Sequence, residues 1–348
     1  MGTKMKAAFL TGIKALEIRE TPEPQLQRGD EALLRVAKVG VCGSDLHYYN
    51  QGCIGNQVVQ FPFIIGHECA AVVEEIGKNA IHLKRGDAVA VDPAVSCGVC
   101  QQCRVGRPHT CLNLQFLGCP GQKPGCLAEY IVMPIRNCTK LPEGVSLEQG
   151  TLAEPLSIGV YALDFLQGTS PQAIGVLGSG PIGLSAVLAA KAAGVPSIFV
   201  TDKIKTRTRA SLAAGARWAG NPEQTDIVGE IFAQSKGLDA VLECCGDPAA
   251  LDQAVELLKP GGRLLILGIP EIETLAFNAH TLRRKELCIQ NVRRQNNCTS
   301  RALRLISEKK VDVDFMATHS FPLEAIQQAF ELVSNYGDGV IKAMITFP

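Results

Sequence analysis

The feature that most constrains this chain is the stretch from Ile174 to Gly183, which reads Ile-Gly-Val-Leu-Gly-Ser-Gly-Pro-Ile-Gly. Apolar residues lead into three glycines at the spacing G-x-G-x-x-G, and an alanine-rich run with helical spacing continues to Ala193. The order predicts a strand, a tight turn and a helix, in which the glycines turn the chain, admit a pyrophosphate and let the helix pack on the strand. The pyrophosphate would sit on free amides at the helix N-terminus. The candidate dinucleotide-binding residues are Gly178, Gly180, Pro181, Ile182 and Gly183.

The next predicted strand narrows the choice of dinucleotide. A glycine turn alone is weak evidence, because the chain has 34 glycines and similar turns occur in α/β proteins that bind nothing. Ser197–Thr201 ends in Asp202, about 20 residues after the turn, where an acid holds a ribose 2′-hydroxyl and repels a 2′-phosphate. The pattern favours NAD over NADP, with Lys203 and Arg207 as candidates to flank the adenosine ribose. The alternative is that Asp202 caps the following helix.

Length and charge exclude several classes of protein. A chain of 348 residues is long for one core and predicts two domains. Its 34 basic and 34 acidic residues balance, which gives no electrostatic case for binding nucleic acid or a membrane surface. No apolar run approaches the ~18 residues of a membrane-spanning helix. The short apolar patch near the N-terminus ends too soon for a signal peptide, so we expect a cytoplasmic protein.

Two regions differ in their patterning. Residues 1–155 are expected to form a mostly β domain, because short β-branched segments alternate with turns. Residues 156–290 are expected to form a doubly wound parallel sheet, because strands alternate with helices. Residues 291–348 lose this alternation and are expected to return to the first domain. The strands expected in the first domain are Glu31–Val41, Ala70–Ile76, Ala88–Val91 and Tyr130–Met133.

The elements expected in the rest of the chain follow from the same patterns. The further strands are Ile174–Leu177, Ser197–Thr201, Asp239–Glu243, Arg263–Leu267, Leu287–Gln290 and Gly339–Phe347. The helices are Glu148–Gly168, Ile182–Ala193, Lys203–Ala214, Ile227–Ser235, Ala249–Leu258, Ser300–Ser307 and Leu323–Ser334.

A four-cysteine motif, C-x2-C-x2-C-x7-C, lies in an irregular lobe at residues 97–111 that has few apolar residues to stabilise it. Four thiolates around one Zn²⁺ make a closed tetrahedral site, which is structural rather than catalytic. An iron–sulfur cluster is the first alternative, although the usual bacterial run has a shorter last spacing. Disulfides are the second, and a cytoplasmic location disfavours them. The candidate ligands are Cys97, Cys100, Cys103 and Cys111.

A second, dispersed set consists of Cys42 and the pair His67-Glu68. Each is unremarkable alone, since a cysteine at a strand end is usually part of the core and a His-Glu pair usually lies at the surface. Together they supply S, N and O ligands and leave a fourth position for water or substrate, which is the composition of a catalytic zinc site. Spacing alone does not decide between a catalytic zinc site and residues with ordinary core and surface roles.

The chain resembles the zinc-containing medium-chain alcohol and polyol dehydrogenases over essentially its whole length. The motifs that carry the resemblance occur in the family's order: Cys42-Gly43-Ser44-Asp45, Gly66-His67-Glu68, the four-cysteine lobe, Ala153-Glu154-Pro155-Leu156-Ser157 and the glycine turn. Within the family it is most similar to the sorbitol (L-iditol)/xylitol dehydrogenases, judged by Cys42–Tyr49 and Gly52–Gly55. The resemblance implies a GroES-like catalytic domain and a Rossmann NAD-binding domain.

The resemblance also implies roles for individual residues. Cys42, His67 and Glu68 would ligate the catalytic zinc, and Glu154 would hold the zinc-bound water or approach the metal directly. Asp45 would orient His67, as carboxylates often do for metal-ligating histidines. Ser44 and His47 would relay the proton of the alcohol to solvent. The residues expected to line the polyol pocket are Tyr48, Ile54, Phe116 and Arg294.

One segment departs from the family pattern. The chain reads Val292-Arg293-Arg294-Gln295-Asn296-Asn297, whereas sorbitol dehydrogenases have an aromatic residue before the arginine and a tyrosine after it. Two inward-facing arginines would make a cationic pocket wall, and the alternative is that Arg293 points to solvent. A carboxylated or phosphorylated sugar therefore stays open as substrate.

The implied reaction is the reversible, zinc-assisted oxidation of a secondary alcohol to a ketone by NAD, with two zinc ions per subunit. Relatives form dimers or tetramers, which implies a homo-oligomer, with a tetramer favoured. L-Threonine 3-dehydrogenase is an alternative in the same family. A dinucleotide-binding protein without activity is a further alternative, which predicts a broken ligand set, whereas all the matched ligands are present.

Overall fold

The computed structural model describes residues 3–79 and 82–348. The chain divides into two compact units. The first comprises the chain up to Glu154 together with Ala302–Glu308 and Val313–Pro348, and the second comprises Pro155–Arg301 with Lys309–Asp312. Residues 291–301 therefore belong to the second unit, whereas the sequence placed them in the segment that returns to the first.

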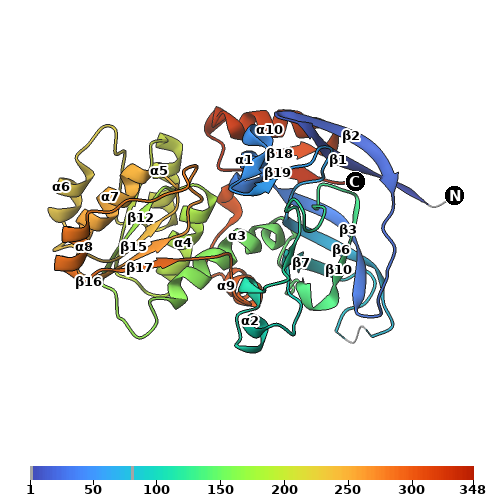
Figure 1. The fold of residues 1–348 in the computed structure, drawn as a ribbon, viewed down its shortest axis with the longest axis horizontal. Helices are drawn as coiled ribbons and strands as arrows, with labels where there is room; N and C mark the ends of the chain where they lie inside the picture. Colours follow the sequence, from blue (N-terminus) through green and yellow to red (C-terminus); the bar gives the residue numbers. More distant parts are fainter. Residues whose placement is uncertain (1–2, 80–81) are drawn as a thin grey trace. The chain divides into compact units, whose positions relative to one another are not determined.

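The first unit is built on a seven-stranded sheet in the order β11-β7-β6-β3-β19-β18, with β10 also paired to β3. Strand β19 runs antiparallel to β3, so a late segment of the chain completes a sheet begun by an early one (Figure 1). The strands of this sheet are β3 (Glu31–Gly40), β6 (Glu68–Ile76), β7 (Ala88–Val91), β10 (Tyr130–Pro134), β11 (Cys138–Lys140), β18 (Ala317–Pro322) and β19 (Lys342–Thr346).

Aliphatic side chains explain why these segments form a buried sheet. Leu34, Val36 and Val39 of β3 have no exposed surface, and β-branched residues such as the two valines fit a pleated surface packed on a core. Tyr49 and Phe330 add an aromatic contact, with ring centroids 5.2 Å apart. The strands of the unit outside this sheet are β1 (Lys4–Gly12), β2 (Ala15–Pro22), β4 (Cys53–Ile54), β5 (Gln57–Val58), β8 (Ala94–Val95) and β9 (Gln115–Phe116).

Several elements of the first unit were not expected from the sequence. These are the hairpin β1–β2, the helix α1, which carries many polar residues, and the strand β18. The helices of this unit are α1 (Gly43–Gln51), α2 (Gln101–Arg104) and α10 (Ile326–Ser334). Short 3-10 helices cover Pro108–Thr110, Ile135–Asn137, Asp314–Met316, Leu323–Ala325 and Gly337–Gly339. Helices α3 (Leu147–Asp164) and α9 (Thr299–Ser307) each contain a boundary between the units.

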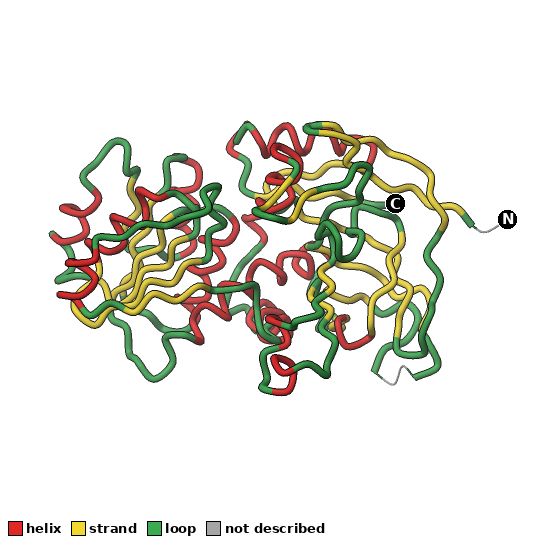
Figure 2. Tube along the Cα trace, in the orientation of Figure 1, coloured by secondary structure: helices red, strands yellow, loops and turns green. Residues whose placement is uncertain are grey.

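The second unit is a parallel six-stranded sheet in the order β14-β13-β12-β15-β16-β17. Figure 2 shows these strands in yellow with helices in red around them. The expected doubly wound parallel sheet is confirmed, and β14 and α8 are additions to it. The strands are β12 (Ala173–Leu177), β13 (Ser197–Thr201), β14 (Trp218–Gly220), β15 (Leu238–Glu243), β16 (Leu258–Ile266) and β17 (Cys288–Asn291). The helices are α4 (Pro181–Ala192), α5 (Lys205–Ala214), α6 (Ile227–Phe232), α7 (Pro248–Leu257) and α8 (Ala279–Lys285).

The strand order reverses beside β12, which pairs with β13 on one side and β15 on the other. In doubly wound sheets ligands bind outside the carboxyl ends of the strands at such a reversal. The glycine turn follows the carboxyl end of β12, so the topology places it at the expected position. Within residues 3–79 and 82–348, no helix is both long and apolar enough to cross a membrane.

Candidate metal and dinucleotide sites

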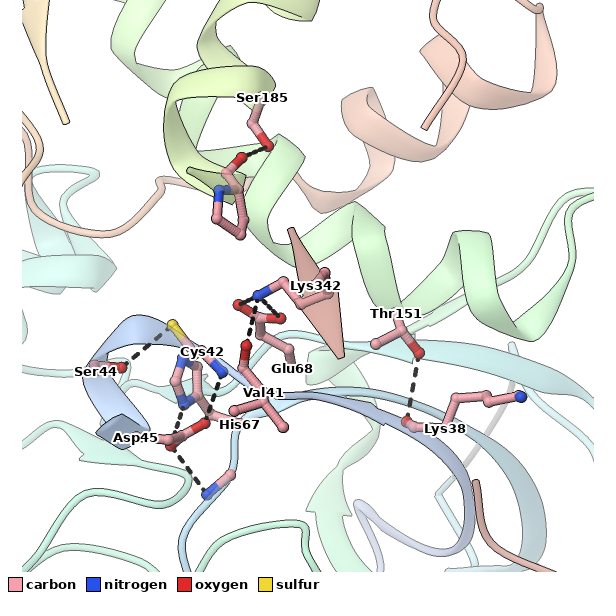
Figure 3. Close-up of polar contacts among 12 residues, drawn as sticks. Lys38, Val41, Cys42, Ser44, Asp45, His67, Glu68, Thr151, Ser185 and Lys342 are labelled. Carbon is pink, nitrogen blue, oxygen red and sulfur yellow. Dashed lines mark hydrogen bonds and ion pairs between the residues drawn. The ribbon is translucent and has the colours of Figure 1, made fainter. Parts of the chain in front are cut away.

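The first site gathers Cys42, His67 and Glu68. Gly40 of β3 is paired in register with Glu68 of β6, so the segments carrying Cys42 and His67 lie at one edge of the sheet. Each of the three residues offers a ligand atom, and these atoms lie within 4.8 Å of one another (Figure 3). His67 and Glu68 are buried and Cys42 is half-buried. The fold thus brings together the S, N and O donors that the sequence left dispersed.

Asp45 connects the two segments that carry these donors. Its Oδ2 accepts a hydrogen bond from the backbone N–H of Cys42 at 3.1 Å, and its Oδ1 accepts one from Gly66 N–H at 3.2 Å. Oδ1 also lies 3.4 Å from Nδ1 of His67. One buried carboxylate therefore contacts both backbone segments and the imidazole, and its role in orienting a metal-bound His67 stays a prediction.

The electrostatics of the imidazole suit a cation. Burial alone would lower the pKa of His67, but the neighbouring Asp45 carboxylate and the Cys42 sulfur raise it well above its ordinary value. These two neighbours therefore stabilise positive charge on the imidazole itself. A set of thiolate, imidazole and carboxylate donors in such a field fits Zn²⁺.

Lys342 of β19 is a site residue that sequence reasoning missed. Its side chain is 1% exposed, and Nζ donates to Oε1 and Oε2 of Glu68 at 2.8 and 2.6 Å and to the carbonyl of Val41 at 3.0 Å. The sequence does contain a sign of its role, a single lysine in the apolar run Val340–Ile345. A lysine in a buried strand needs a partner of opposite charge.

Glu154 of α3 interacts electrostatically with His67, Glu68 and Lys342. Burial raises its pKa to about 7, His67 and Lys342 oppose the rise, and Glu68 and Asp92 add to it. Among the described residues, the cluster of donor atoms within 4.8 Å contains Cys42, His67 and Glu68 but not Glu154. The role of Glu154 at the metal or at its water stays a prediction.

Helix α1 carries the residues expected to move the proton. Ser44 Oγ lies 3.4 Å from the sulfur of Cys42 and is oriented to donate to it. His47, one turn further along, is half-buried. The structure thus places Ser44 beside the candidate metal site, and the relay through His47 stays a prediction.

Two of the expected pocket residues lie beside the site in the first unit. The ring of Phe116 is 5.3 Å from the ring of His67. The hydroxyl of Tyr48 lies 3.4 Å from Oε1 of Gln57 and 3.8 Å from the sulfur of Cys119. Ile54 lies in β4 and is half-buried.

The arginine pair belongs to the second unit. Arg293 is exposed, as the solvent-facing alternative expects, and Arg294 is half-buried with a positive φ of 56°. The next residue, Gln295, is 4% exposed. Of the two arginines, Arg294 is thus the less exposed, and its place in a substrate pocket stays a prediction.

The four-cysteine lobe forms a second metal site. The sulfurs of Cys97, Cys100, Cys103 and Cys111 lie within 4.8 Å of one another, with 3.5 Å between Cys100 and Cys103 and 3.8 Å between Cys100 and Cys111. Four sulfurs each about 2.3 Å from one zinc would be about 3.8 Å apart, so the spacing fits a single ion and is too small for a cluster of several irons. All four thiols are free. Backbone amides donating to its sulfur lower the pKa of Cys100 to about 6, which favours a thiolate there, whereas burial raises the pKa of Cys111 to about 11.

The glycine turn has the geometry that the motif predicts. Gly178 has φ of 89°, where a side chain would be strained, and a Cβ on Gly183 would overlap the carbonyl oxygen of Gly178. Gly180 precedes α4, and a Cβ there would meet Arg207 Nη1 at 3.4 Å. Arg207 therefore lies next to the turn, and its contact with the dinucleotide stays a prediction. Lys203 pairs instead with Glu223 and Asp247 at 3.2 and 3.3 Å.

The carboxylate of Asp202 accepts hydrogen bonds from two backbone segments. Its Oδ2 accepts from Ser179 N–H in the glycine turn at 2.7 Å, and its Oδ1 accepts from Ile204 N–H before α5 at 2.8 Å. The side chain is thus at the turn, where the ribose was expected, and it also stabilises the start of the following helix. Both alternatives drawn from the sequence have a structural basis, and the contact with ribose stays a prediction.

Comparison with known proteins decides the family. Residues 28–143 match the alcohol dehydrogenase GroES-like domain and residues 181–308 match the zinc-binding dehydrogenase domain. Sorbitol dehydrogenase of Bacillus subtilis is 36% identical over 98% of this chain and 97% of its own length. The chain belongs to the zinc-containing medium-chain alcohol and polyol dehydrogenases. This dehydrogenase is also 34% identical to L-idonate 5-dehydrogenase of Vitis vinifera, over 99% of this chain and 95% of that protein.

Solved structures agree with the family. An alcohol dehydrogenase from Thermus superposes with a TM-score of 0.90 at 28% identity, covering 99% of this chain and 100% of the other. A structure from Escherichia coli described as an alcohol dehydrogenase and complexed with NADH has a TM-score of 0.90 at 31% identity, with the same coverage. The expected GroES-like and Rossmann folds, the activity on CH–OH groups, and zinc and a nicotinamide dinucleotide as cofactors are confirmed.

Proposed function

We propose that this dehydrogenase reversibly oxidises a secondary hydroxyl of a polyol or sugar-derived molecule to a ketone, with NAD as the hydride acceptor. The observation that carries the proposal is the convergence of Cys42, His67 and Glu68 beside the buried acid Glu154. Relatives named for sorbitol and for L-idonate support a polyhydroxylated substrate. Bound at these three residues, zinc would lower the pKa of a neighbouring hydroxyl and stabilise negative charge on its oxygen.

The chain's own residues would handle the proton. Ser44 lies next to Cys42 and can accept the proton of the alcohol, and His47 on the same helix can pass it towards water. With a pKa raised to about 7, Glu154 can exchange a proton near neutral pH, where a general acid or base works best. Asp45 keeps His67 and the segment of Cys42 in place throughout, because its carboxylate bonds to both.

The substrate would be recognised by a mixed wall. In the first unit, Phe116 and Ile54 supply apolar surface and Tyr48 supplies a hydroxyl. An alternating surface of this kind suits a molecule with several hydroxyls and a carbon backbone. A sugar acid or sugar phosphate is the second candidate within the same reaction class, since similar proteins are named for L-idonate and for galactitol 1-phosphate.

A substrate panel tests the proposal. Sorbitol, xylitol, L-arabinitol, L-idonate, galactitol 1-phosphate and L-threonine would each be offered with NAD and with NADP, following nicotinamide absorbance on zinc-replete protein. We expect turnover with at least one polyol or sugar derivative and a preference for NAD. Turnover of L-threonine alone would replace the proposal by the amino-alcohol alternative, and no turnover with any of them would refute it.

The proposal extends to assembly and location. The protein would act in the cytoplasm on small molecules, as a homo-oligomer with four or two subunits. Light scattering after size exclusion gives the mass directly, and a monomeric mass at micromolar concentration would contradict this part.

A further inference from the structure

Glu243 is a buried acid that the reaction does not use. It ends strand β15, next to β12, so its side chain lies at the carboxyl edge of the sheet where the strand order reverses. It is 1% exposed. A carboxylate is costly to bury unless its oxygens are hydrogen-bonded, so its surroundings need an account.

The carboxylate shapes the loop that follows it. Oε1 accepts the backbone N–H groups of Cys245 and of Gly246, both at 2.6 Å, which are short, charge-assisted bonds. Oε2 faces Gly268, where an added Cβ would lie 2.7 Å from it. The side chain therefore folds residues 244–246 back over the end of their own strand.

That loop is packed against the glycine turn. An added Cβ on Gly178 would lie 2.7 Å from the Cβ of Cys245 and 3.0 Å from its backbone nitrogen. The N–H of Cys244 donates to the carbonyl of Leu177, the last residue before the turn, at 2.8 Å. The position of the loop thus decides how much room is left around Gly178.

The loop after β16 also contacts residues 243–246. The N–H groups of Leu267 and Gly268 donate to the carbonyl of Glu243 at 2.8 and 3.0 Å, and a Cβ on Gly246 would meet the carbonyl oxygen of Ile269 at 2.5 Å. The loops after β12, β15 and β16 are in backbone contact. The side chain of Glu243 lies among them. A shift of residues 244–246 cannot leave the turn unchanged.

We propose that Glu243 is a positioning residue for the dinucleotide: by holding residues 244–246 it keeps the turn at Gly178 open to the pyrophosphate. It touches neither substrate nor the reacting atoms. The inference goes beyond the proposed function, because it concerns the dinucleotide whichever alcohol is oxidised. Dinucleotide binding can be measured without an alcohol, so a failed substrate panel leaves it intact.

The experiment compares three variants of the full, zinc-replete protein by NADH fluorescence titration. Glu243→Ala removes both hydrogen bonds and is expected to raise the Kd for NADH at least tenfold. Glu243→Gln keeps an oxygen that can accept both N–H groups and is expected to stay within about threefold. Glu230→Gln changes an exposed acid of the same unit and should bind as the unchanged protein does.

Further readouts separate positioning from a merely structural role. Zinc content and the KM for the alcohol should stay unchanged in Glu243→Gln and Glu243→Ala, while the KM for the dinucleotide follows the Kd. If Glu243→Ala does not fold, Glu243→Asp replaces it, since a shorter carboxylate cannot reach the two amides, and the same tenfold loss is expected. An Ala or Asp variant that binds NADH within twofold of the unchanged protein overturns the proposal. So does equal loss in Gln and Ala accompanied by equal falls in melting temperature.

Discussion

Lys342 holds Glu68 by both carboxylate oxygens, at 2.8 and 2.6 Å, although 274 residues separate them in the sequence. Both side chains are almost fully buried, at 1% and 0% exposed. A buried pair is expensive to form, and removing one partner leaves an uncompensated charge. The metal site is thus tied electrostatically to strand β19, which supplies none of its ligands.

The first prediction concerns this pair. Lys342→Met should lower the free energy of unfolding by about 3–5 kcal/mol, because Glu68 is left charged and buried. Denaturant unfolding measures the change. The matched control is Lys4→Met, which removes the partner of an exposed acid, Glu20, and should leave the free energy of unfolding almost unchanged. Equal costs in the two variants would mean that water reaches the Glu68 pair.

Glu154 should matter for turnover rather than for folding. Glu154→Gln removes an acid whose pKa is about 7 and should lower kcat by about 100-fold, the lower end of general acid–base catalysis. Glu148→Gln, in the same helix but partly exposed, serves as control and should be neutral. Zinc analysis separates the two roles left open. Unchanged zinc supports action through water, and loss of one zinc ion per chain identifies Glu154 as a ligand.

The four-cysteine lobe should lose its metal independently of the other site. Cys100→Ser should reduce bound zinc from about two ions to about one per chain and lower the melting temperature, because the lobe depends on four thiolates. Cys53→Ser, a free half-buried cysteine outside both clusters, should change neither value. Loss of both zinc ions from Cys100→Ser would contradict the separation of the sites.

Asp202 should set the preference between dinucleotides. Asp202→Ala removes the charge that repels a 2′-phosphate, so the ratio of kcat/KM with NADP to that with NAD should rise at least tenfold. The variant should also lose stability, by about 1–3 kcal/mol, since the N–H groups of Ser179 and Ile204 lose their acceptor. Asp226→Ala, which removes the acceptor at the start of α6, controls for lost helix capping alone. An unchanged cofactor ratio would leave Asp202 with a structural role only.

Acid should weaken the second unit through Asp239. Burial tends to raise its pKa, but Lys259 and the N–H groups of Ala173 and Gln172 lower it below the ordinary value. A lowered pKa in the folded state gives stability that is present above the unfolded pKa, about 3.9, and is lost as pH falls through the folded pKa. The stability difference between the unchanged protein and Asp239→Asn should be constant from pH 7 to about pH 5 and shrink below pH 4. Urea unfolding across this range measures it, and a difference that grows in acid would reverse the sign.

Local patterns predicted most of the second unit. Strand β12 consists of five buried residues followed by the glycine motif, so periodicity and spacing marked both the strand and its function. Strand β14 has three residues and α8 seven, and both are too short for periodicity to show. Short elements of this kind are fixed by their neighbours rather than by their own sequence.

The metal sites divide in the same way. The spacing of four cysteines within 15 residues was enough to predict the structural metal site, because closeness in sequence limits how far apart the thiols can lie. Cys42 and the His67-Glu68 pair became a site only through the pairing of β3 with β6, and family resemblance rather than spacing joined them. Lys342 was missed because its partner is defined by strand order, which no local pattern records.

The position of β19 between β3 and β18 has a consequence for how the protein is made. Residues 155–301, nearly the whole second unit, are synthesised between Glu68 and the lysine that neutralises it. Domains tend to fold as they leave the ribosome. The nascent chain therefore carries a finished Rossmann domain while the sheet that bears the metal ligands still lacks an inner strand. Glu68 spends that interval without its ammonium partner, so the metal-binding half of the enzyme is encoded first and matures last.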